Sequence, residues 1–235
     1  MIRISTTTAC AGLAVAIASF AAPAAALADG LTFQSQERWV EVTVPSDASG
    51  ITRVSSPSFT LFNQSLTDFG TNSNGASGKG DANQTSSLGD KITASGYVSG
   101  IGGGALGSGF GIGESYFKTT FTAATNTDFA FVFNARSFDS SVVQYFNFSL
   151  TGTGVNFANN PDDFRLLFGQ TFNMNGQGTL IAGETYTLEI DLYASGDGAS
   201  SSGEGDFAFT MTTIPAPSTA LAMGLALLPT TRRRR

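Results

Sequence analysis

The sequence predicts an all-β protein: an antiparallel, Greek-key or jelly-roll-like β-sandwich, with an N-terminal signal peptide and a C-terminal short transmembrane helix. Only 13% of its 235 residues are charged, whereas glycine (28) and phenylalanine (20) are abundant, a composition typical of secreted β proteins. Apolar residues alternate with polar ones in several short runs, as in strands with one buried face. No stretch before the C-terminal segment shows convincing helical periodicity.

The N-terminal 28 residues have the features of a secretory signal peptide. Arg3 gives a cationic start, an apolar run extends from Ala9 to Ala22, and Ala26-Leu27-Ala28 supplies small residues at a cleavage site. We therefore expect export by the Sec machinery and cleavage after Ala28, with the sandwich domain occupying residues 29–213. The single cysteine, Cys10, lies in this leader, so the body is expected to contain no disulfide.

The first half of the body contains a strong strand candidate and several weaker ones. Val40, Val42 and Val44 share one face of the alternating run Glu37 to Val44, which predicts a strand. Residues 51–55 and 59–66 are weaker candidates separated by Pro57, and residues 91–98 resume the alternation.

Two stretches in this half are predicted to be flexible because they contain few residues that can bury area. Residues 70–90 are expected to form a solvated loop or linker. Residues 100–113 contain eight glycines and are expected to connect two strands flexibly. A phosphate-binding loop would need a following helix N-terminus, whereas residues 114–122 are rich in β-formers.

The second half contains four regular runs of period two, each with one apolar, mostly aromatic face. Such runs are typical of antiparallel strands that cover a shared core. Burying one phenylalanine contributes roughly 1.5–3 kcal/mol, so facing rows can stabilise a domain without disulfides. The apolar faces are Phe129, Phe131 and Phe133; Phe146, Phe148 and Leu150; Leu188, Ile190 and Leu192; and Phe207, Phe209 and Met211.

A tyrosine corner is predicted at Tyr186. The run from Leu180 to Tyr186 has the spacing Leu-x-Ala-Gly-x-x-Tyr and leads into a strand. In this motif the tyrosine hydroxyl bonds to upstream backbone and fixes a crossing between sheets, so the role expected for Tyr186 is structural.

Charge and residue usage exclude several classes of function. The sequence has no histidine, which removes Ser-His-Asp and Cys-His catalysis and the usual general base near neutral pH. Between the terminal segments, seven basic residues face eighteen acidic ones, giving a net charge of −11. Such a surface repels phosphate backbones, so no nucleic-acid partner is expected. We expect a non-enzymatic protein with no catalytic residues.

One carboxylate pair resembles the minimal equipment of a glycoside hydrolase. Glu189 and Asp191 lie two residues apart on one strand face, and Glu184 precedes the strand. Paired carboxylates can protonate a glycosidic oxygen and activate water. Outward positions on strands are ordinarily polar, so the favoured interpretation is a solvated face.

Carbohydrate and calcium binding are two further alternatives. A glycan-binding sheet face would use amphipathic aromatic residues, and the sole tryptophan is equally suited to a sandwich core. The aromatic candidates are Trp39, Tyr97, Tyr116, Tyr145 and Tyr193. Two stretches rich in side-chain oxygens, residues 159–163 and 197–206, could bind calcium, although neither has the ligand spacing of an EF-hand. The candidate calcium ligands are Asp162, Asp163, Asp197 and Asp206, and no other cofactor is expected.

The C-terminal segment, residues 214–235, combines three parts in a fixed order. Pro215-Ala216-Pro217 precedes an apolar run from Ser218 to Leu228, and Arg232, Arg233, Arg234 and Arg235 end the chain. An apolar helix followed by cations stops in a bilayer with the charged end in the cytoplasm. The fourteen residues from Ser218 to Thr231 span about 21 Å as a helix, against a hydrocarbon core of roughly 30 Å. Such a length suits a temporary hold.

These features together resemble the bacterial PEP-CTERM proteins, with Ala216 where that family has glutamate. The resemblance implies a partner, an exosortase-like membrane enzyme that sorts and cleaves the chain near Pro215 to Pro217. It also implies a Gram-negative host that makes exopolysaccharide, and transient anchoring in the inner membrane before delivery to the cell surface or extracellular matrix. The expected function is therefore that of a non-enzymatic surface or matrix protein. The alternatives are a module that binds exopolysaccharide and, less favoured, a glycoside hydrolase.

Overall fold

The computed structural model describes residues 30–47, 50–104, 109–138, 144–159, 165–167, 169–198 and 202–214. The expected signal peptide with its cleavage after Ala28, and the sorting segment from Pro215 onward, lie outside these residues. Within the described part, no helix is long and apolar enough to cross a membrane.

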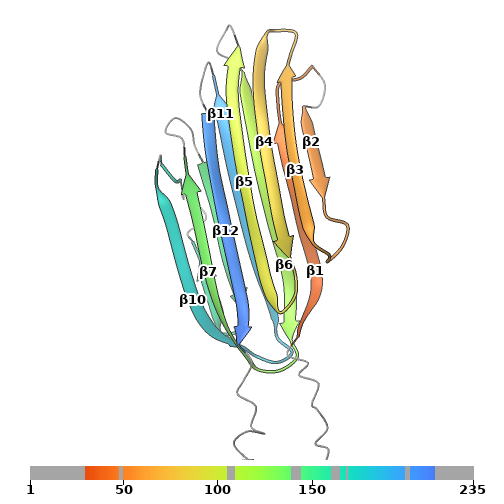
Figure 1. Ribbon diagram of the computed structural model, residues 1–235, viewed down its shortest axis with the longest axis vertical. Coiled ribbons are helices and arrows are strands. Elements are labelled where there is room, and N and C mark those ends of the chain that lie inside the picture. Colours follow the sequence, from red (N-terminus) through yellow and green to blue (C-terminus); the bar gives the residue numbers. More distant parts are fainter. Residues whose placement is uncertain are drawn as a thin grey trace, which may run out of the picture.

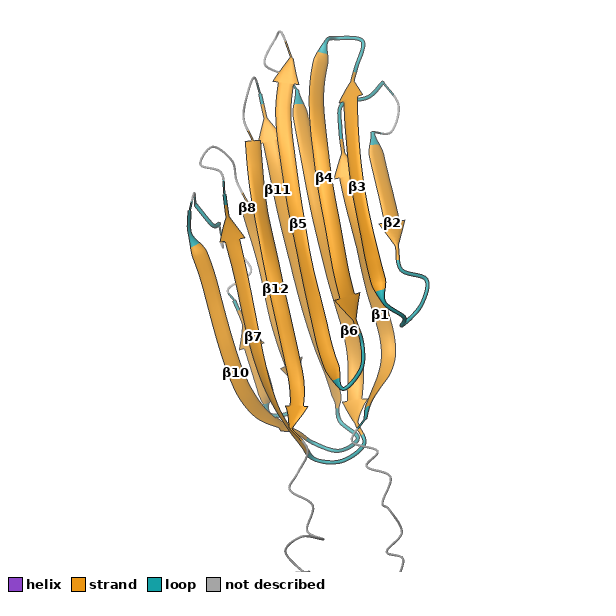
Figure 2. Cartoon of the chain, in the orientation of Figure 1, coloured by secondary structure: helices purple, strands orange, loops and turns teal. Residues whose placement is uncertain are grey.

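The described residues form twelve strands in two six-stranded sheets that pack face to face, as Figures 1 and 2 show. Sheet A has the order β2-β1-β6-β11-β8-β9, and sheet B has the order β10-β7-β12-β5-β4-β3. The strands are β1 (Leu31–Thr43), β2 (Ile51–Ser55), β3 (Phe62–Thr71), β4 (Ala76–Ser87), β5 (Lys91–Gly104), β6 (Phe110–Ala123), β7 (Thr127–Ser137), β8 (Gln144–Gly152), β9 (Val155–Ala158), β10 (Thr171–Leu180), β11 (Thr185–Asp197) and β12 (Ser202–Ile214).

Every paired neighbour in the two sheets is antiparallel, and the central strands pair with partners far away in sequence. In sheet A, β6 lies between β1 and β11; in sheet B, β12 lies between β7 and β5. The all-β sandwich predicted from composition and alternation is therefore confirmed.

Phenylalanine fills the half of the sandwich nearer the pole where β12 ends. All twelve apolar residues predicted from the four regular runs are at most 3% exposed. Rings from the two sheets meet directly: Phe133 of β7 stacks on Phe148 of β8 with centroids 4.6 Å apart. Val40 and Val42 of β1 are fully buried in the same core, as their shared face predicts.

Glycine replaces side chains in the other half, where the two sheets touch through their backbones. A Cβ on Gly113 of β6 would lie 2.1 Å from the carbonyl oxygen of Asp81 in β4, and one on Gly100 of β5 would lie 2.2 Å from that of Gly111. Cα atoms of β5 and β6 come within 8 Å, although packed sheets are ordinarily about 10 Å apart. The prediction of a flexible connection over residues 100–113 is wrong for its described part, because its glycines belong to β5 and β6.

The prediction of a flexible loop over residues 70–90 is also wrong. Strand β4 occupies residues 76–87, and a short turn at Gly75, whose φ is 77°, joins it to β3. The small side chains of β4 have a structural reason: Gly78 and Gly80 face the carbonyl oxygens of Phe110 and Ile112 in the opposite sheet. What looks like a linker is a strand whose inward neighbour is backbone.

Two buried side chains, Tyr186 and Arg38, fix connecting segments to the sandwich through hydrogen bonds to backbone groups. The Tyr186 hydroxyl accepts a hydrogen bond from the Ile181 N–H (2.7 Å) and donates one to the Thr153 carbonyl (3.3 Å), which confirms the predicted tyrosine corner. Arg38 of β1, only 1% exposed, donates to the carbonyl oxygens of Ser58 (2.5 Å) and Thr60 (2.8 Å). These bonds hold the segment between β2 and β3 against β1, and burial lowers the pKa of Arg38.

The body begins and ends at the same pole of the sandwich, the lower end in Figure 1. The Thr213 N–H donates to the carbonyl oxygen of Asp90 (3.3 Å), and Gly30 lies beside the carboxylate of the same Asp90. The first and the last described residues, Gly30 and Ile214, therefore lie at the same pole.

The backbone contact between sheets predicts a large cost for a single methyl group. Gly113→Ala forces its Cβ against two carbonyl oxygens, so we expect destabilisation by about 3 kcal/mol or more, measured by urea unfolding. Gly89→Ala is the matched control, because its Cβ would meet nothing nearer than 4.0 Å, and its effect should stay within about 1 kcal/mol. Equal stability of the two variants would contradict the packing described.

Candidate functional site

The outer face of sheet A carries a cluster of carboxylates, which we call the acidic face: Glu41 of β1, Glu114 of β6, and Glu189 and Asp191 of β11. Strand register brings them together: Glu41 pairs with Glu114, while Glu189 and Asp191 pair with Lys118 and Tyr116 of β6. Side chains alternate between the faces of a strand, so the inward neighbours of these residues form the core and the carboxylates point outward.

A stacked ladder of three side chains flanks the acidic face. The guanidinium of Arg53 in β2 lies 3.9 Å from the Trp39 ring centroid, and Trp39 stacks on Tyr116 with centroids 5.0 Å apart. Both faces of the indole are therefore occupied, and Trp39 is only 7% exposed. The ladder is tied to the carboxylates, because Arg53 Nε donates to Glu41 (2.6 Å).

Glu189 is held by two partners from β6. The Tyr116 hydroxyl donates to its Oε1 (3.2 Å), and Lys118 Nζ lies 2.9 Å from its Oε2. Burial, together with the charge of Glu189, raises the pKa of the Tyr116 hydroxyl. This carboxylate is thus engaged in contacts that fix β6 to β11.

Asp191 differs from its neighbours because it faces carboxylates without a cation of its own. Burial, reinforced by the charges of Glu114 and Glu189, raises the pKa of Asp191 to about 8. Burial and the charge of Glu41 likewise raise the pKa of Glu114, which shares a hydrogen bond with Asp191. The Oδ1 atom of Asp191 is buried and has no hydrogen-bond partner among the described residues.

This arrangement favours one shared proton between Glu114 and Asp191 at neutral pH. Glycoside hydrolases use a protonated carboxyl as the acid and an ionised carboxylate as the base or nucleophile. The sequence suggests Glu189 and Asp191 as such a pair. The structure places both of these residues on the acidic face. Burial raises the pKa of Asp191 most, and the side chain with the next largest effect on this pKa is Glu114 rather than Glu189. Sequence reasoning missed Glu114 because only the register between β6 and β11 reveals it.

The predicted aromatic candidates are divided between the two sheets. Tyr193 shares the outer face of sheet A with Trp39 and Tyr116, and the Tyr145 backbone pairs with Tyr193 in the register of β8 and β11. Tyr97 lies instead in β5 of sheet B, where its hydroxyl donates to Glu204 (2.6 Å).

The calcium candidates that the structure describes are not brought together. Asp197 ends β11 in sheet A, whereas Asp206 lies in β12 of sheet B and accepts a hydrogen bond from Arg136 Nε (2.9 Å). Asp162 and Asp163 lie outside the described residues. No group of three or more acidic, histidine or cysteine side chains suited to a metal occurs in the described part of the chain.

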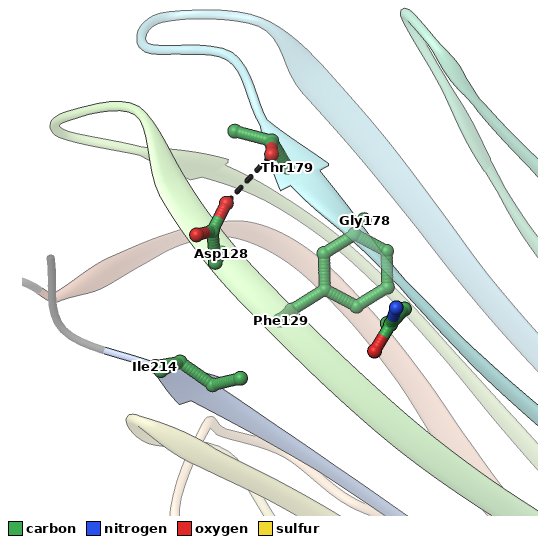
Figure 3. Close-up of a pocket in the computed structure, with 6 residues that line it drawn as sticks. Asp128, Phe129, Gly178, Thr179 and Ile214 are labelled. Atoms are coloured by element: carbon green, nitrogen blue, oxygen red, sulfur yellow. Dashed lines mark hydrogen bonds between the residues drawn. The ribbon is translucent and has the colours of Figure 1, made fainter.

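The outer face of sheet B carries two shallow hollows along β7. The first, which we call the Arg136 hollow, has a volume near 310 Å³; it is lined by Asn134, Arg136, Thr171, Asn173, Asp206, Phe207 and Ala208. The second, near 280 Å³, lies at the pole where β12 ends, with Gln177 and Ile214 in its lining. There Thr179 donates to Asp128 (2.6 Å), and the Phe129 ring lies beside Gly178 (Figure 3).

No protein-family model and no curated protein matches this sequence. Among solved structures, a chain in a structure of the infectious bursal disease virus Gx strain is similar, with a TM-score of 0.28 and 9% identity. The similarity covers 77% of the present chain and 56% of the viral chain, so the chain spans little more than half the length of that protein. A likeness this distant carries no argument about function.

The raised pKa of Asp191 predicts how stability depends on pH. The folded protein holds the proton of Asp191 more tightly than the unfolded chain does. The contribution of this carboxyl to the free energy of unfolding is therefore complete below pH 4 and is lost as the pH rises through about 8. The slope reaches at most about 1.4 kcal/mol per pH unit.

We expect Asp191→Asn to reduce the fall in the free energy of unfolding between pH 5 and pH 8, since the amide imitates the protonated carboxyl. Urea unfolding at these two pH values measures that fall. Glu184→Gln removes an exposed carboxylate next to the same strand and should keep the wild-type slope. An unchanged slope in Asp191→Asn would contradict the shared proton.

Proposed function

We propose that this chain is an exported, non-enzymatic protein of the cell surface or extracellular matrix of a Gram-negative bacterium, sorted through its C-terminal segment. The proposal rests first on the order of parts after Ile214: the Pro-Ala-Pro turn, the apolar run and the four arginines. The position of Ile214 supports it, because β12 ends at the pole where β1 begins. A tail held in a bilayer would then leave the opposite, glycine-packed pole directed away from the membrane.

The contacts of the acidic face support a structural role for sheet A. Glu41 and Glu189 are each bound by a cation, and the indole of Trp39 is covered on both faces. A sugar ring that stacked on Trp39 would have to displace Arg53 or Tyr116. The face is therefore better described as a set of cross-strand contacts than as a platform for substrate.

Glycan binding is a second candidate, and the Arg136 hollow favours it. Its rim combines the amides of Asn134 and Asn173 with the Arg136–Asp206 ion pair, and the small Ala208 leaves room between them. Amides, a guanidinium and a carboxylate offer the donors and acceptors that sugar hydroxyls require. A volume near 310 Å³ lies at the lower end for small-molecule sites and suits a single sugar unit.

Export and sorting predict loss of both ends from the mature protein. In the producing bacterium, intact mass should show a chain that begins at Asp29 and lacks Arg232 to Arg235. Replacing the four arginines with glutamine should abolish the C-terminal cleavage, because the cationic stop is lost, whereas four lysines should preserve it. A mature protein that retains Arg232 to Arg235 would overturn the proposed sorting.

Glycan binding predicts that filling the Arg136 hollow abolishes recognition. Ala208→Leu should lower binding to the polysaccharide of the producing strain at least tenfold on a glycan array or by calorimetry. Ala130→Leu, on the same outer face but outside that hollow, is the matched control and should bind as wild type. Absence of binding by the wild-type protein, or equal binding by both variants, would remove this candidate.

A further inference from the structure

The two sheets differ in how their edges end. Sheet A is bounded by β2, of five residues, and β9, of four, whereas sheet B is bounded by β10 and β3, of ten residues each. Among the described residues, no strand pairs with the outer edge of β10 or β3. A strand edge presents a row of free N–H and C=O groups, and proteins commonly suppress pairing there by keeping edge strands short. Sheet A follows that rule and sheet B does not.

The composition of the long edges does not protect them either. Strand β10 contains no charged residue and no proline, and β3 contains a single charge, Asp68. That carboxylate accepts hydrogen bonds from Thr52 of β2 (3.2 Å) and from the Phe69 N–H (2.8 Å). Lysine and proline, two usual deterrents to edge pairing, are therefore missing from both strands, and Asp68 is the one charge that either strand carries.

Apolar surface accompanies the free backbone at both edges. On β3, Phe69 is 67% exposed. On β10, Phe172 and Met174 are only partly buried against the core, because the opposite edge strand, β9, is short. A strand added at either edge would cover apolar side chains as well as satisfy backbone groups.

Strand direction makes the two edges complementary. Sheet B has six strands, and every neighbouring pair is antiparallel. The first and the sixth strand therefore run in opposite directions. When a second copy is moved sideways without being turned over, its β10 lies antiparallel to β3 of the first copy, so the alternation of the sheet continues.

We propose that copies of this chain associate head to tail through sheet B, with β10 of one copy paired to β3 of the next. Equal length, opposite direction and the scarcity of charge, with Asp68 alone on the two strands, select this pairing. Because the contact joins two different surfaces, it leaves a free β3 and a free β10 at the ends and can propagate. The inference concerns the sandwich alone and stands independently of the proposed route of export.

The test uses two variants, each with one edge blocked by lysines at exposed positions of the full chain. Asn175→Lys with Gln177→Lys blocks β10, and Ser65→Lys with Thr67→Lys blocks β3. Asn83→Lys with Thr85→Lys, one strand in from the edge on β4, adds the same charge as a matched control. Sedimentation velocity from micromolar to millimolar protein gives the size distribution, and circular dichroism verifies that each variant folds.

Wild type and the β4 control should form oligomers that grow with concentration, and each edge variant alone should be monomeric. An equimolar mixture of the two edge variants should form dimers and nothing larger, since one free β3 and one free β10 remain compatible. Monomeric wild type would overturn the proposal. Self-association of both edge variants would overturn it as well, because the tail or a sheet face would then mediate contact. Dimers of the β3-blocked variant alone would replace it with pairing of β10 to β10.

Discussion

The sandwich depends on the contact between the backbones of its two sheets at the glycine-packed pole. Gly78 and Gly80 of β4 and Gly111 and Gly113 of β6 bring carbonyl oxygens of one sheet to positions that a Cβ of the other would occupy. No rotamer change relieves such a clash, because the opposing atom belongs to the main chain. This close approach fixes the separation of the sheets at one pole, and the phenylalanine rings fix it at the other.

The two poles achieve stability by different means. Around β7 and β8, stacked and tilted rings fill the space between the sheets, and each buried phenylalanine contributes roughly 1.5–3 kcal/mol. At the glycine-packed pole, little apolar area is available to bury, and the contribution comes from dispersion between closely packed backbones. Contacts between outward side chains therefore contribute a larger share of the stability there. The ladder of Arg53, Trp39 and Tyr116 is such a contact, because it joins β2, β1 and β6 across the outer face of sheet A.

The alternating runs could be predicted from sequence because their signal is local. Phe129, Phe131 and Phe133 alternate with smaller or polar residues, and Tyr186 follows a recognisable corner motif, so both were placed correctly. The glycine strands were missed for a physical reason: glycine at alternate positions marks a buried face only when backbone lies opposite. A sequence does not show what lies opposite, and the same residues match a linker equally well.

Only part of the candidate site could be predicted from the sequence, because some of its residues are close together in the chain and others are brought together by strand pairing. Glu189 and Asp191 stand two residues apart, so their shared face follows from the period of a strand. Glu114 joins them through pairing of β6 with β11 across more than seventy residues of sequence, and Glu41 through pairing of β1 with β6. Burial is the largest cause of the raised pKa of Asp191, and the charge of the distant Glu114 raises it further; burial and the charge of Glu41 raise the pKa of Glu114 in turn.

The direction of the strands connects the proposed anchoring with the proposed association. The strands run along the long axis of the molecule, so the edges β3 and β10 extend from one pole toward the other (Figure 1). The described chain begins and ends at one pole, where Gly30 and Thr213 both lie beside Asp90. The proposed anchoring through the tail would therefore occupy an end of the sandwich, while the proposed edge pairing would occupy its flanks. Copies held in one membrane would stand side by side with their long edges exposed to one another, and the two contacts would support each other.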